Sequence, residues 1–320
     1  MNILILSAGT RNKIVQYFKK ELNGKGKVIA TDCSDLAPAI YEADKYYIVP
    51  RIDDPVSIDI ILDICKKERV ETLISLIDPE LSLIAKNIDK FRSIGVSPII
   101  SDYDKVEMCF DKYKMYKFLV DNSFNTIKSY IDINEFYKDL KDGKINFPIF
   151  VKPVKGSASL NINKVSSKDE LDVIWKHNKD LIIQEFMTGQ EYGADVYIDM
   201  LSCEPVAIFT KKKIKMRAGE TDKSVSIKNA KLFKLIETFV KKAGFKGIID
   251  IDIFETNNEY FISEVNPRFG GGYPHAYECG VNVPRMIINN INGIENKPEI
   301  GKYSDDIYMM KYNEIKIIKK

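Results

Sequence analysis

The fold is decided by two neighbouring stretches, which read Ile249-Asp250-Ile251-Asp252-Ile253-Phe254 and Tyr260-Phe261-Ile262-Ser263-Glu264-Val265-Asn266-Pro267-Arg268. In the first stretch isoleucine and aspartate alternate, so a strand would carry the isoleucines on one face and the aspartates on the other. The second stretch places Glu264 and Asn266 on one face of the next strand, and residues 256–259 form the turn. The pattern predicts a β-hairpin with one apolar and one polar face.

Acidic side chains on one sheet face, with an amide oxygen beside them, offer the oxygen ligands that magnesium prefers together with nucleotide phosphates. The alternative is a half-exposed hairpin whose polar side chains face water. Pro267-Arg268 and the run Gly270-Gly271-Gly272 follow at once, which is more typical of a site than of an ordinary sheet edge. The sequence therefore favours a metal site on this hairpin.

A shared metal site also requires a particular register. If Asp252 lies opposite Glu264, then Asp250 lies opposite Asn266, and the turn between the strands contains an odd number of residues. A two-residue turn at Asn257-Asn258 would put the two carboxylates on opposite faces, because a slip of one residue inverts every side chain. We therefore predict a three-residue or bulged turn.

A second candidate is a lysine followed by a loop of small residues, in Phe150-Val151-Lys152-Pro153-Val154-Lys155-Gly156-Ser157-Ala158-Ser159. Lys152 at the end of a buried strand would supply a point charge. The backbone N–H groups of Gly156, Ser157, Ala158 and Ser159 could then close over the β- and γ-phosphates of a nucleotide. A purely structural loop is an equally good interpretation of this stretch alone.

A third candidate is an apolar strand that runs into a turn, in Leu181-Ile182-Ile183-Gln184-Glu185-Phe186-Met187-Thr188-Gly189-Gln190-Glu191. Backbone groups around Glu185 and Met187 could pair with the edge of adenine, and the Glu191 carboxylate could accept from ribose hydroxyls. An ordinary strand and turn explains the same residues, so this stretch needs support from the others.

The organisation of the chain changes after about residue 100. Before it, short apolar runs alternate with amphipathic helices, which predicts a doubly wound parallel α/β lobe. In that lobe, Asp54-Pro55 and Asp78-Pro79 each supply an N-cap and a first-turn proline for a helix. After it, a helix is expected at 111–121 and a strand at 147–151, and strands joined by turns dominate from about Leu181 onward. We expect three units, at 1–100, 101–180 and 181–320, giving an α/β lobe and two α+β subdomains.

The overall composition of the sequence limits the classes of function and of partner that can be expected. The hydrophobic share of 45% is ordinary for a globular protein, and 48 basic against 46 acidic side chains leave a net charge of +2. We therefore expect no nucleic-acid partner. We expect Lys211-Lys212-Lys213 to be a solvated surface, with a phosphate-facing role as the alternative. The five cysteines are scattered without a Cys-x-x-Cys pair, which is typical of a reducing compartment. With neither a signal peptide nor a membrane-length apolar run, a cytoplasmic protein is expected.

Together these segments resemble the ATP-grasp superfamily. The likeness is nearest to one ATP-grasp unit of the carbamoyl phosphate synthase large subunit and to related stand-alone carboxylate–amine ligases. It is most specific at Glu264-Val265-Asn266-Pro267-Arg268. The resemblance implies an ATP-grasp fold whose two α+β subdomains grip ATP, with Glu264, Asn266 and Asp252 as ligands of Mg²⁺, for which Mn²⁺ could substitute.

The resemblance also implies the contacts to ATP. Arg268 would face the transferred phosphate. Two basic residues on separate subdomains would contact ATP, namely Lys152 and Lys112, although Lys114 lies close to the second. The adenine hinge and the ribose carboxylate correspond to the residues Gln184, Glu185, Phe186, Met187 and Glu191.

Two departures from the family pattern are visible. The synthase large subunit carries two ATP-grasp units and works with a glutamine amidotransferase, whereas this sequence carries one unit. Asp252 is also shorter than the Glu or Gln often found at its position. The expected reaction is phosphorylation of a carboxylate by ATP to an acyl phosphate, followed by displacement of phosphate by an amine.

The small-molecule carboxylate and amine would sit between the lobes, and a homodimer is left open. Five substrate-binding candidates come from three places, the opening of the first helix, the second Asp-Pro pair and the end of the glycine run: Thr10, Arg11, Asp78, Glu80 and His275. Each has a structural alternative, which is a plain turn, helix capping or a structural histidine. Arg217, in a polar glycine-containing loop, could fold onto the acyl phosphate, or could be solvated.

Rival functions remain. One is carboxyphosphate and carbamate chemistry like that of the synthase. Another, from a different class, is a nucleotide-binding regulatory subunit without turnover. A dinucleotide-dependent oxidoreductase is set aside because no Gly-x-Gly-x-x-Gly follows the first strand.

Overall fold

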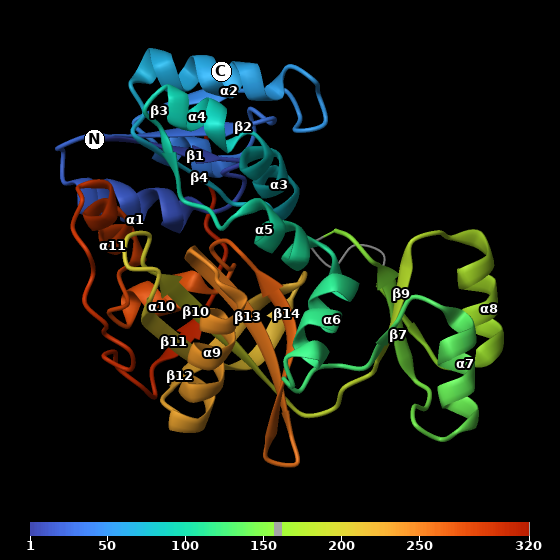
Figure 1. Ribbon diagram of the computed structural model, residues 1–320. Coiled ribbons are helices and arrows are strands. Elements are labelled where there is room, and N and C mark those ends of the chain that lie inside the picture. Colours follow the sequence, from blue (N-terminus) through green and yellow to red (C-terminus); the bar gives the residue numbers. More distant parts are fainter. Residues whose placement is uncertain (157–161, 320) are drawn as a thin grey trace.

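The computed structural model describes residues 1–156 and 162–319. Three of the residues predicted to contact the phosphates of ATP lie outside these ranges, namely Ser157, Ala158 and Ser159. Three sheets organise the chain (Figure 1). Within the described ranges, no helix combines the length and the apolar character needed to cross a membrane.

The N-terminal lobe is built on a parallel sheet of order β3-β2-β1-β4-β5. Its strands are β1 (Asn2–Leu6), β2 (Lys27–Asp32), β3 (Lys45–Ile48), β4 (Thr72–Ser75) and β5 (Ser97–Pro98). Its helical segments are α1 (Asn12–Leu22), η1 (Pro38–Glu42), α2 (Ser57–Glu68), α3 (Asp78–Lys86) and α4 (Ile88–Ser93). The doubly wound lobe expected from the sequence is confirmed.

The two Asp-Pro pairs do not cap helices as predicted. Helix α2 starts at Ser57 after an uncapped Val56, and the Asp54 carboxylate instead accepts from the Val56 N–H at 3.0 Å. Helix α3 starts at Asp78 itself, and Ile77 is its N-cap residue. The Asp78 side chain is thereby left to contact a residue far along the chain.

The middle of the chain forms a small subdomain that projects to one side (Figure 1). Helices α5 (Tyr103–Phe110) and α6 (Lys112–Asp121) lead into it. Its antiparallel sheet, of order β6-β9-β7-β8, contains β6 (Ser129–Tyr130), β7 (Ile149–Pro153), β8 (Asn163–Val165) and β9 (Leu181–Glu185). Helices α7 (Ile133–Lys141) and α8 (Lys168–His177) bury Phe136 and Leu171 in a core of its own.

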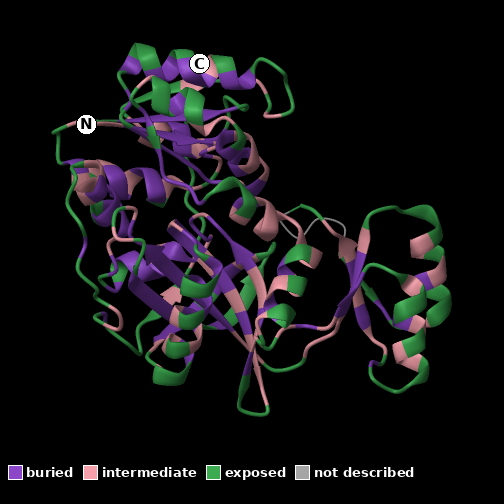
Figure 2. Cartoon of the chain, viewed as in Figure 1, coloured by how far each residue is buried: buried purple, intermediate pink, exposed green. Residues whose placement is uncertain are grey.

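The third sheet is antiparallel, with the order β14-β13-β10-β11-β12-β15. It contains β10 (Gln190–Ile198), β11 (Pro205–Arg217), β12 (Glu220–Ile227), β13 (Gly247–Thr256), β14 (Glu259–Asn266) and β15 (Tyr308–Met310). Ile249, Ile251 and Ile253 are fully buried on one face, in a core shared with α9 (Ala230–Ala243) and α6. In Figure 2 much of this sheet is purple, and the helices that cover it change between purple, pink and green along their length.

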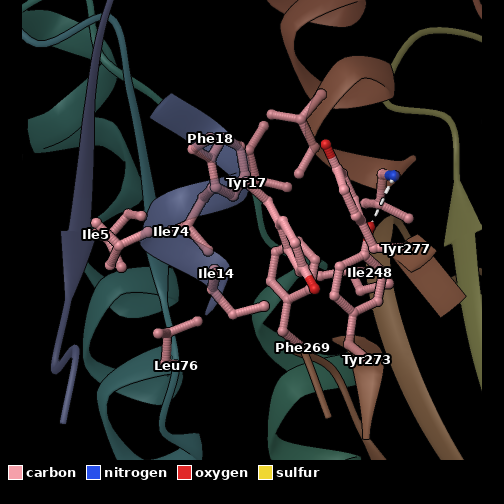
Figure 3. Packing of buried hydrophobic residues seen from close by; sticks show 14 of the residues in the cluster. Ile5, Ile14, Tyr17, Phe18, Ile74, Leu76, Ile248, Phe269, Tyr273 and Tyr277 are labelled. Atoms are coloured by element: carbon pink, nitrogen blue, oxygen red, sulfur yellow. Dashed lines mark hydrogen bonds between the residues drawn. The ribbon is translucent and has the colours of Figure 1, made fainter. Parts of the chain in front are cut away.

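The N-terminal lobe is packed firmly against the third sheet by aromatic residues (Figure 3). Tyr17 of α1 stacks on Tyr277 of α10 (Tyr273–Glu278) with ring centroids 3.7 Å apart, and Phe18 meets Phe269 edge-on at 6.1 Å. Helix α11 (Val283–Ile291) also contributes Ile287 to this cluster. This packing fixes the ends of β1 and β4 beside the predicted metal hairpin.

The buried carboxyl group of Glu80 makes the stability of this lobe depend on pH. Its carboxyl group is buried and accepts from the Ser75 hydroxyl at 2.5 Å, and burial raises its pKa to about 7. An unfolded glutamate titrates near 4.3, so folding favours the protonated form, and stability falls as pH rises through 7.

We expect Glu80→Gln to be more stable than the wild type above pH 7, by about 3 kcal/mol, and to lose most of the pH dependence between pH 5 and 8. Urea unfolding at several pH values measures this difference. Lower stability of the variant at pH 8 would show that the native carboxyl is ionised and stabilising.

Candidate functional site

A cavity of about 430 Å³ lies where the three sheets meet. The N-terminal lobe contributes Arg11 and Asp78, the small subdomain contributes Lys152 and Gln184, and residues of the third sheet line the rest. Most of the candidate residues proposed from the sequence therefore converge on one place.

The register of the β13–β14 hairpin is the one that a shared site requires. Asp252 pairs with Glu264 and Asp250 with Asn266, as predicted. The predicted turn is wrong, because the turn has two residues, Asn257 and Asn258, with φ of 52° and 63°. Asparagine tolerates this left-handed backbone, which suits the tight turns of hairpins.

The odd residue lies in the strand rather than in the turn. The register shifts between Asp252 and Ile253, so that Ser263 is the extra residue of a β-bulge. The Ser263 hydroxyl donates to the Asp252 carbonyl at 3.0 Å. The bulge restores the alignment that a two-residue turn alone would have inverted, and it returns Glu264 to the face of Asp252.

The donor set on this face fits Mg²⁺ that is shared with a phosphate ligand. Asp252, Glu264 and Asn266 all line the cavity and supply two carboxylates and an amide oxygen. Among the described residues, no group of three or more His, Cys, Asp or Glu side chains is placed to hold a metal. Mg²⁺ commonly uses one or two carboxylates plus substrate phosphates, so two carboxylates suffice only when those phosphates are present.

Two lysines expected to be solvated are buried, and Lys213 is part of the cavity wall. Lys213 donates from Nζ to Glu191 and to Asp252, at 2.6 Å each, and Lys211 bonds Asp195 at 2.5 Å. Burial disfavours the charge of Lys213, but the two carboxylates outweigh it and raise its pKa. The solvated-surface prediction is thus wrong for Lys211 and Lys213.

A glycine makes this arrangement possible. Gly193 lies between Lys211 and Asp252 in the sheet, and a Cβ on it would come within 2.9 Å of Lys211 Cε. The absence of a side chain leaves room for Lys211 to reach Asp195 on the strand of Gly193, and for Lys213 to reach over that strand to Asp252. The signal in the sequence was the two-residue spacing of Lys211 and Lys213, which places them on one strand face.

The two predicted phosphate-binding lysines come from different elements and lie close enough for their charges to interact. Lys152 of β7 lines the cavity, and Lys112, at the start of α6, donates to the Gly156 carbonyl at 2.7 Å. Burial lowers the pKa of Lys112 and nearby Lys152 adds to that effect, while Glu264 raises it. Lys114 is exposed, so the geometry favours Lys112 as the second ATP contact.

The predicted adenine hinge lies at the opposite end of the cavity from the N-terminal lobe. Gln184 is held by a bond from its amide to the Ser129 hydroxyl at 2.9 Å, and Gln184, Glu185 and Met187 line the cavity. Phe186 instead packs on Phe150, with ring centroids 5.1 Å apart. Glu191 also lines the cavity, although its carboxylate is engaged by Lys213.

Two arginines line the end of the cavity next to the N-terminal lobe. Arg268 donates from Nε and Nη2 to the Asp78 carboxylate, at 3.0 Å each. Burial opposes its charge, but Asp78 and Asp250 outweigh burial and raise its pKa. Arg11 pairs with Glu220 at 2.8 Å, and Glu220 was not among the predicted site residues.

The glycine run after Arg268 packs directly against the charged side chains of the cavity. A Cβ on Gly270 would come within 2.4 Å of the Asp250 carboxyl carbon, and one on Gly271 within 2.6 Å of Arg11 Nη1 and of the Glu220 carboxyl carbon. Burial, followed by the charges of Asp252 and Asp195, raises the pKa of Asp250 to about 7. Any side chain at Gly270 or Gly271 would displace the groups that line the cavity.

Four of the catalytic and substrate candidates do not line the cavity. Thr10 is exposed, and Glu80 is buried against Ser75. His275 is buried, with Nδ1 bonded to Ser224 and Nε2 to the Ile307 carbonyl, and burial together with Lys211 lowers its pKa to about 4. Arg217 is half-exposed and pairs with Asp222 at 2.9 Å. For His275 and Glu80 this environment indicates structural roles.

Comparison with known proteins identifies the family of the chain. Residues 109–272 match the ATP-grasp domain model, and residues 3–99 match the PylC-like N-terminal domain model. The first match spans just over half of the sequence. The chain therefore belongs to the ATP-grasp family, and both the resemblance and the fold class expected from the sequence are confirmed.

Named relatives are distant. The arginine-specific large chain of carbamoyl phosphate synthase from Geobacillus stearothermophilus is 20% identical over 77% of this chain and 23% of its own length. D-alanine–D-alanine ligase from Helicobacter pylori is 27% identical over 59% of each protein. The chain thus spans about a quarter and about three fifths of these two relatives.

Among solved structures, the biotin carboxylase domain of 2-oxoglutarate carboxylase from Hydrogenobacter thermophilus superimposes with a TM-score of 0.74. The alignment covers 96% of this chain and 73% of that domain at 15% identity. At this identity the likeness establishes the fold.

Proposed function

We propose that this chain is a Mg²⁺-dependent, ADP-forming carboxylate–amine ligase. The observation that carries the proposal is the bulged hairpin, which aligns Asp252, Glu264 and Asn266 on the cavity. Lys152 and Arg268 line the same cavity, and Lys112 lies beside Glu264. A binding protein without turnover needs no such collection of cations around two carboxylates.

ATP would lie with its adenine near Gln184 to Met187 and its phosphates toward Lys152 and Lys112. Mg²⁺ held by Asp252, Glu264 and Asn266 would offset charge on the phosphate oxygens. The related biotin carboxylase domain was solved with MgADP, ADP and bicarbonate. These assignments follow the polarity of the cavity, whose Met187 end is formed by the small subdomain and whose Arg268 end adjoins the N-terminal lobe.

The reaction would proceed in two displacements. A substrate carboxylate oxygen attacks the γ-phosphorus, and the bond to the bridging oxygen breaks with its electron pair leaving on ADP. The amine nitrogen then attacks the acyl carbon, a C–N bond forms, and inorganic phosphate leaves with the C–O electron pair. The ammonium form of the amine releases two protons in total. Lys112, Lys152 and Arg268 stabilise charge on the transferred phosphoryl oxygens.

Release of ADP and phosphate, measured across pairs of small acids and amines with Mg²⁺, tests the proposal. We expect release to require one acid together with one amine, and to stop when EDTA removes the metal. Release with bicarbonate as the acid would support the alternative of carboxyphosphate and carbamate chemistry. ATP binding without release for any pair would support the regulatory alternative. Whether the chain forms a homodimer stays open, and light scattering of the same preparation tests it.

A further inference from the structure

The end of the cavity beside the N-terminal lobe lies at the topological switch point of the parallel sheet. From β1 the sheet extends to one side through β2 and β3, and to the other side through β4 and β5. The strand order therefore reverses between β1 and β4. Ligands of such sheets bind outside the carboxyl ends of the strands at this point. Arg11 follows β1 and Asp78 follows β4, and both line the cavity. The switch point between β1 and β4 is therefore the place expected for a substrate other than ATP.

Both signs of charge are present there in pairs. Arg11 faces Glu220 at 2.8 Å, and Arg268 faces Asp78 at 3.0 Å. Lys311 approaches the other oxygen of Glu220 at 2.7 Å from outside the cavity. A phosphorylated substrate would need cations without carboxylate partners, which this end does not offer among the described residues. Paired charges of opposite sign instead suit a dipolar ligand with no net charge.

The two ion pairs differ in how readily they can exchange partners. Asp78 is only 8% exposed, sits at the start of α3, and binds Arg268 through two donors. Glu220 is 39% exposed and directly follows the tight turn between β11 and β12, where Ala218 and Gly219 have positive φ. The Arg11–Glu220 pair is therefore the exchangeable one, and Glu220 occupies the position at Arg11 that a substrate carboxylate would take.

We propose that this end of the cavity binds an amino acid as the amine substrate of the ligase. The amino acid's carboxylate replaces the Glu220 oxygen at Arg11. The Glu220 oxygen that is released then accepts from the ammonium group, while Lys311 keeps the other oxygen in place. This inference rests on the proposed function and adds the chemical class of one substrate. It also gives Arg11 and Glu220 separate tasks, which can be measured separately.

Isothermal titration of the standard amino acids into the full chain with ATP analogue and Mg²⁺ tests the inference. The best binder is then compared with its decarboxylated amine and its deaminated acid. We expect either analogue to bind about 10–100-fold more weakly, as the loss of a charge-assisted contact implies. Equal binding by an analogue, or no amino acid binding below about 20 mM, would overturn the inference.

Three variants sharpen this test. Arg11→Met should weaken amino-acid binding about 10–100-fold with ATP-analogue binding changed less than about twofold. Glu220→Gln should reduce the preference for the amino acid over its deaminated acid. Arg285→Met removes an arginine from a surface pair with Glu21 at 3.1 Å and is the matched control, with binding expected to be unchanged. An Arg11→Met variant that binds normally would contradict the proposal.

The outcomes separate this inference from the proposed function. Turnover with an acid and a simple amine, without preference for an amino acid, would refute the inference and leave the ligase assignment standing. Amino-acid binding that depends on Arg11, without ATP hydrolysis under any condition, would support the amino-acid site and refute the ligase assignment.

Discussion

Glu264→Gln is expected to lower kcat at least about 100-fold while leaving the fold intact. The residue faces Asp252 across the hairpin and lines the cavity near Lys112, so its charge acts on the metal and on the phosphates at once. Glutamine keeps the shape and removes the charge. Loss of one preorganised contact to transition-state charge typically costs about 10²–10³ in kcat. Steady-state ADP release at saturating ATP and Mg²⁺ measures the effect.

The matched control is Glu259→Gln, which makes the same change at the exposed start of the same strand. We expect this variant to keep its activity, and both variants to keep the thermal unfolding midpoint of the wild type. If Glu264→Gln turned over at a near-normal rate, the assignment of the hairpin face as the metal site would be wrong.

The hairpin shows what alternation in a sequence can predict. Ile249, Ile251 and Ile253 had to share one face because strand side chains alternate, and that left the aspartates on the other. Functional reasoning then predicted the Asp252–Glu264 pairing correctly. It could not predict that Ser263 is a bulge, because the turn and the bulge satisfy the same odd-residue requirement, and the preference of Asn257-Asn258 for a tight turn decided between them.

Two predictions were wrong, the helix cap at Asp78 and the solvated lysine run, because each side chain has a partner that only the fold brings close. Asp78 followed by proline satisfied the local rule for a helix cap, but Arg268, which is 190 residues away, binds its carboxylate instead. Lys211 and Lys213 satisfied the rule that charged runs are solvated, but Asp195 on the neighbouring strand β10 and Asp252 on β13, one strand further on, hold them inside. Local pattern cannot reveal a partner brought close by the sheet order, so these contacts required the fold.

The buried Lys211–Asp195 pair leads to the largest expected effect on stability. The two side chains are 1% and 0% exposed, and one oxygen of Asp195 has no hydrogen-bond partner among the described residues. Lys211→Met therefore leaves a buried carboxylate without compensation. We expect a loss of about 3–5 kcal/mol in the free energy of unfolding, measured by urea denaturation at pH 7.

If the unpaired charge of Asp195 causes the loss of stability in Lys211→Met, then removing that charge should restore stability. Burial already raises the pKa of Asp195, and removal of Lys211 raises it further, so the loss in Lys211→Met should shrink as pH falls and the carboxyl becomes protonated. The double variant Lys211→Met/Asp195→Asn should recover most of the lost stability at pH 7, because it has no unpaired charge. Lys168→Met is the matched control, since that lysine pairs with Asp172 at the same 2.5 Å but is 60% exposed, and it should cost less than about 1 kcal/mol. A double variant as unstable as Lys211→Met would show that packing against Gly193 and Gly272, rather than charge, holds Lys211 in place.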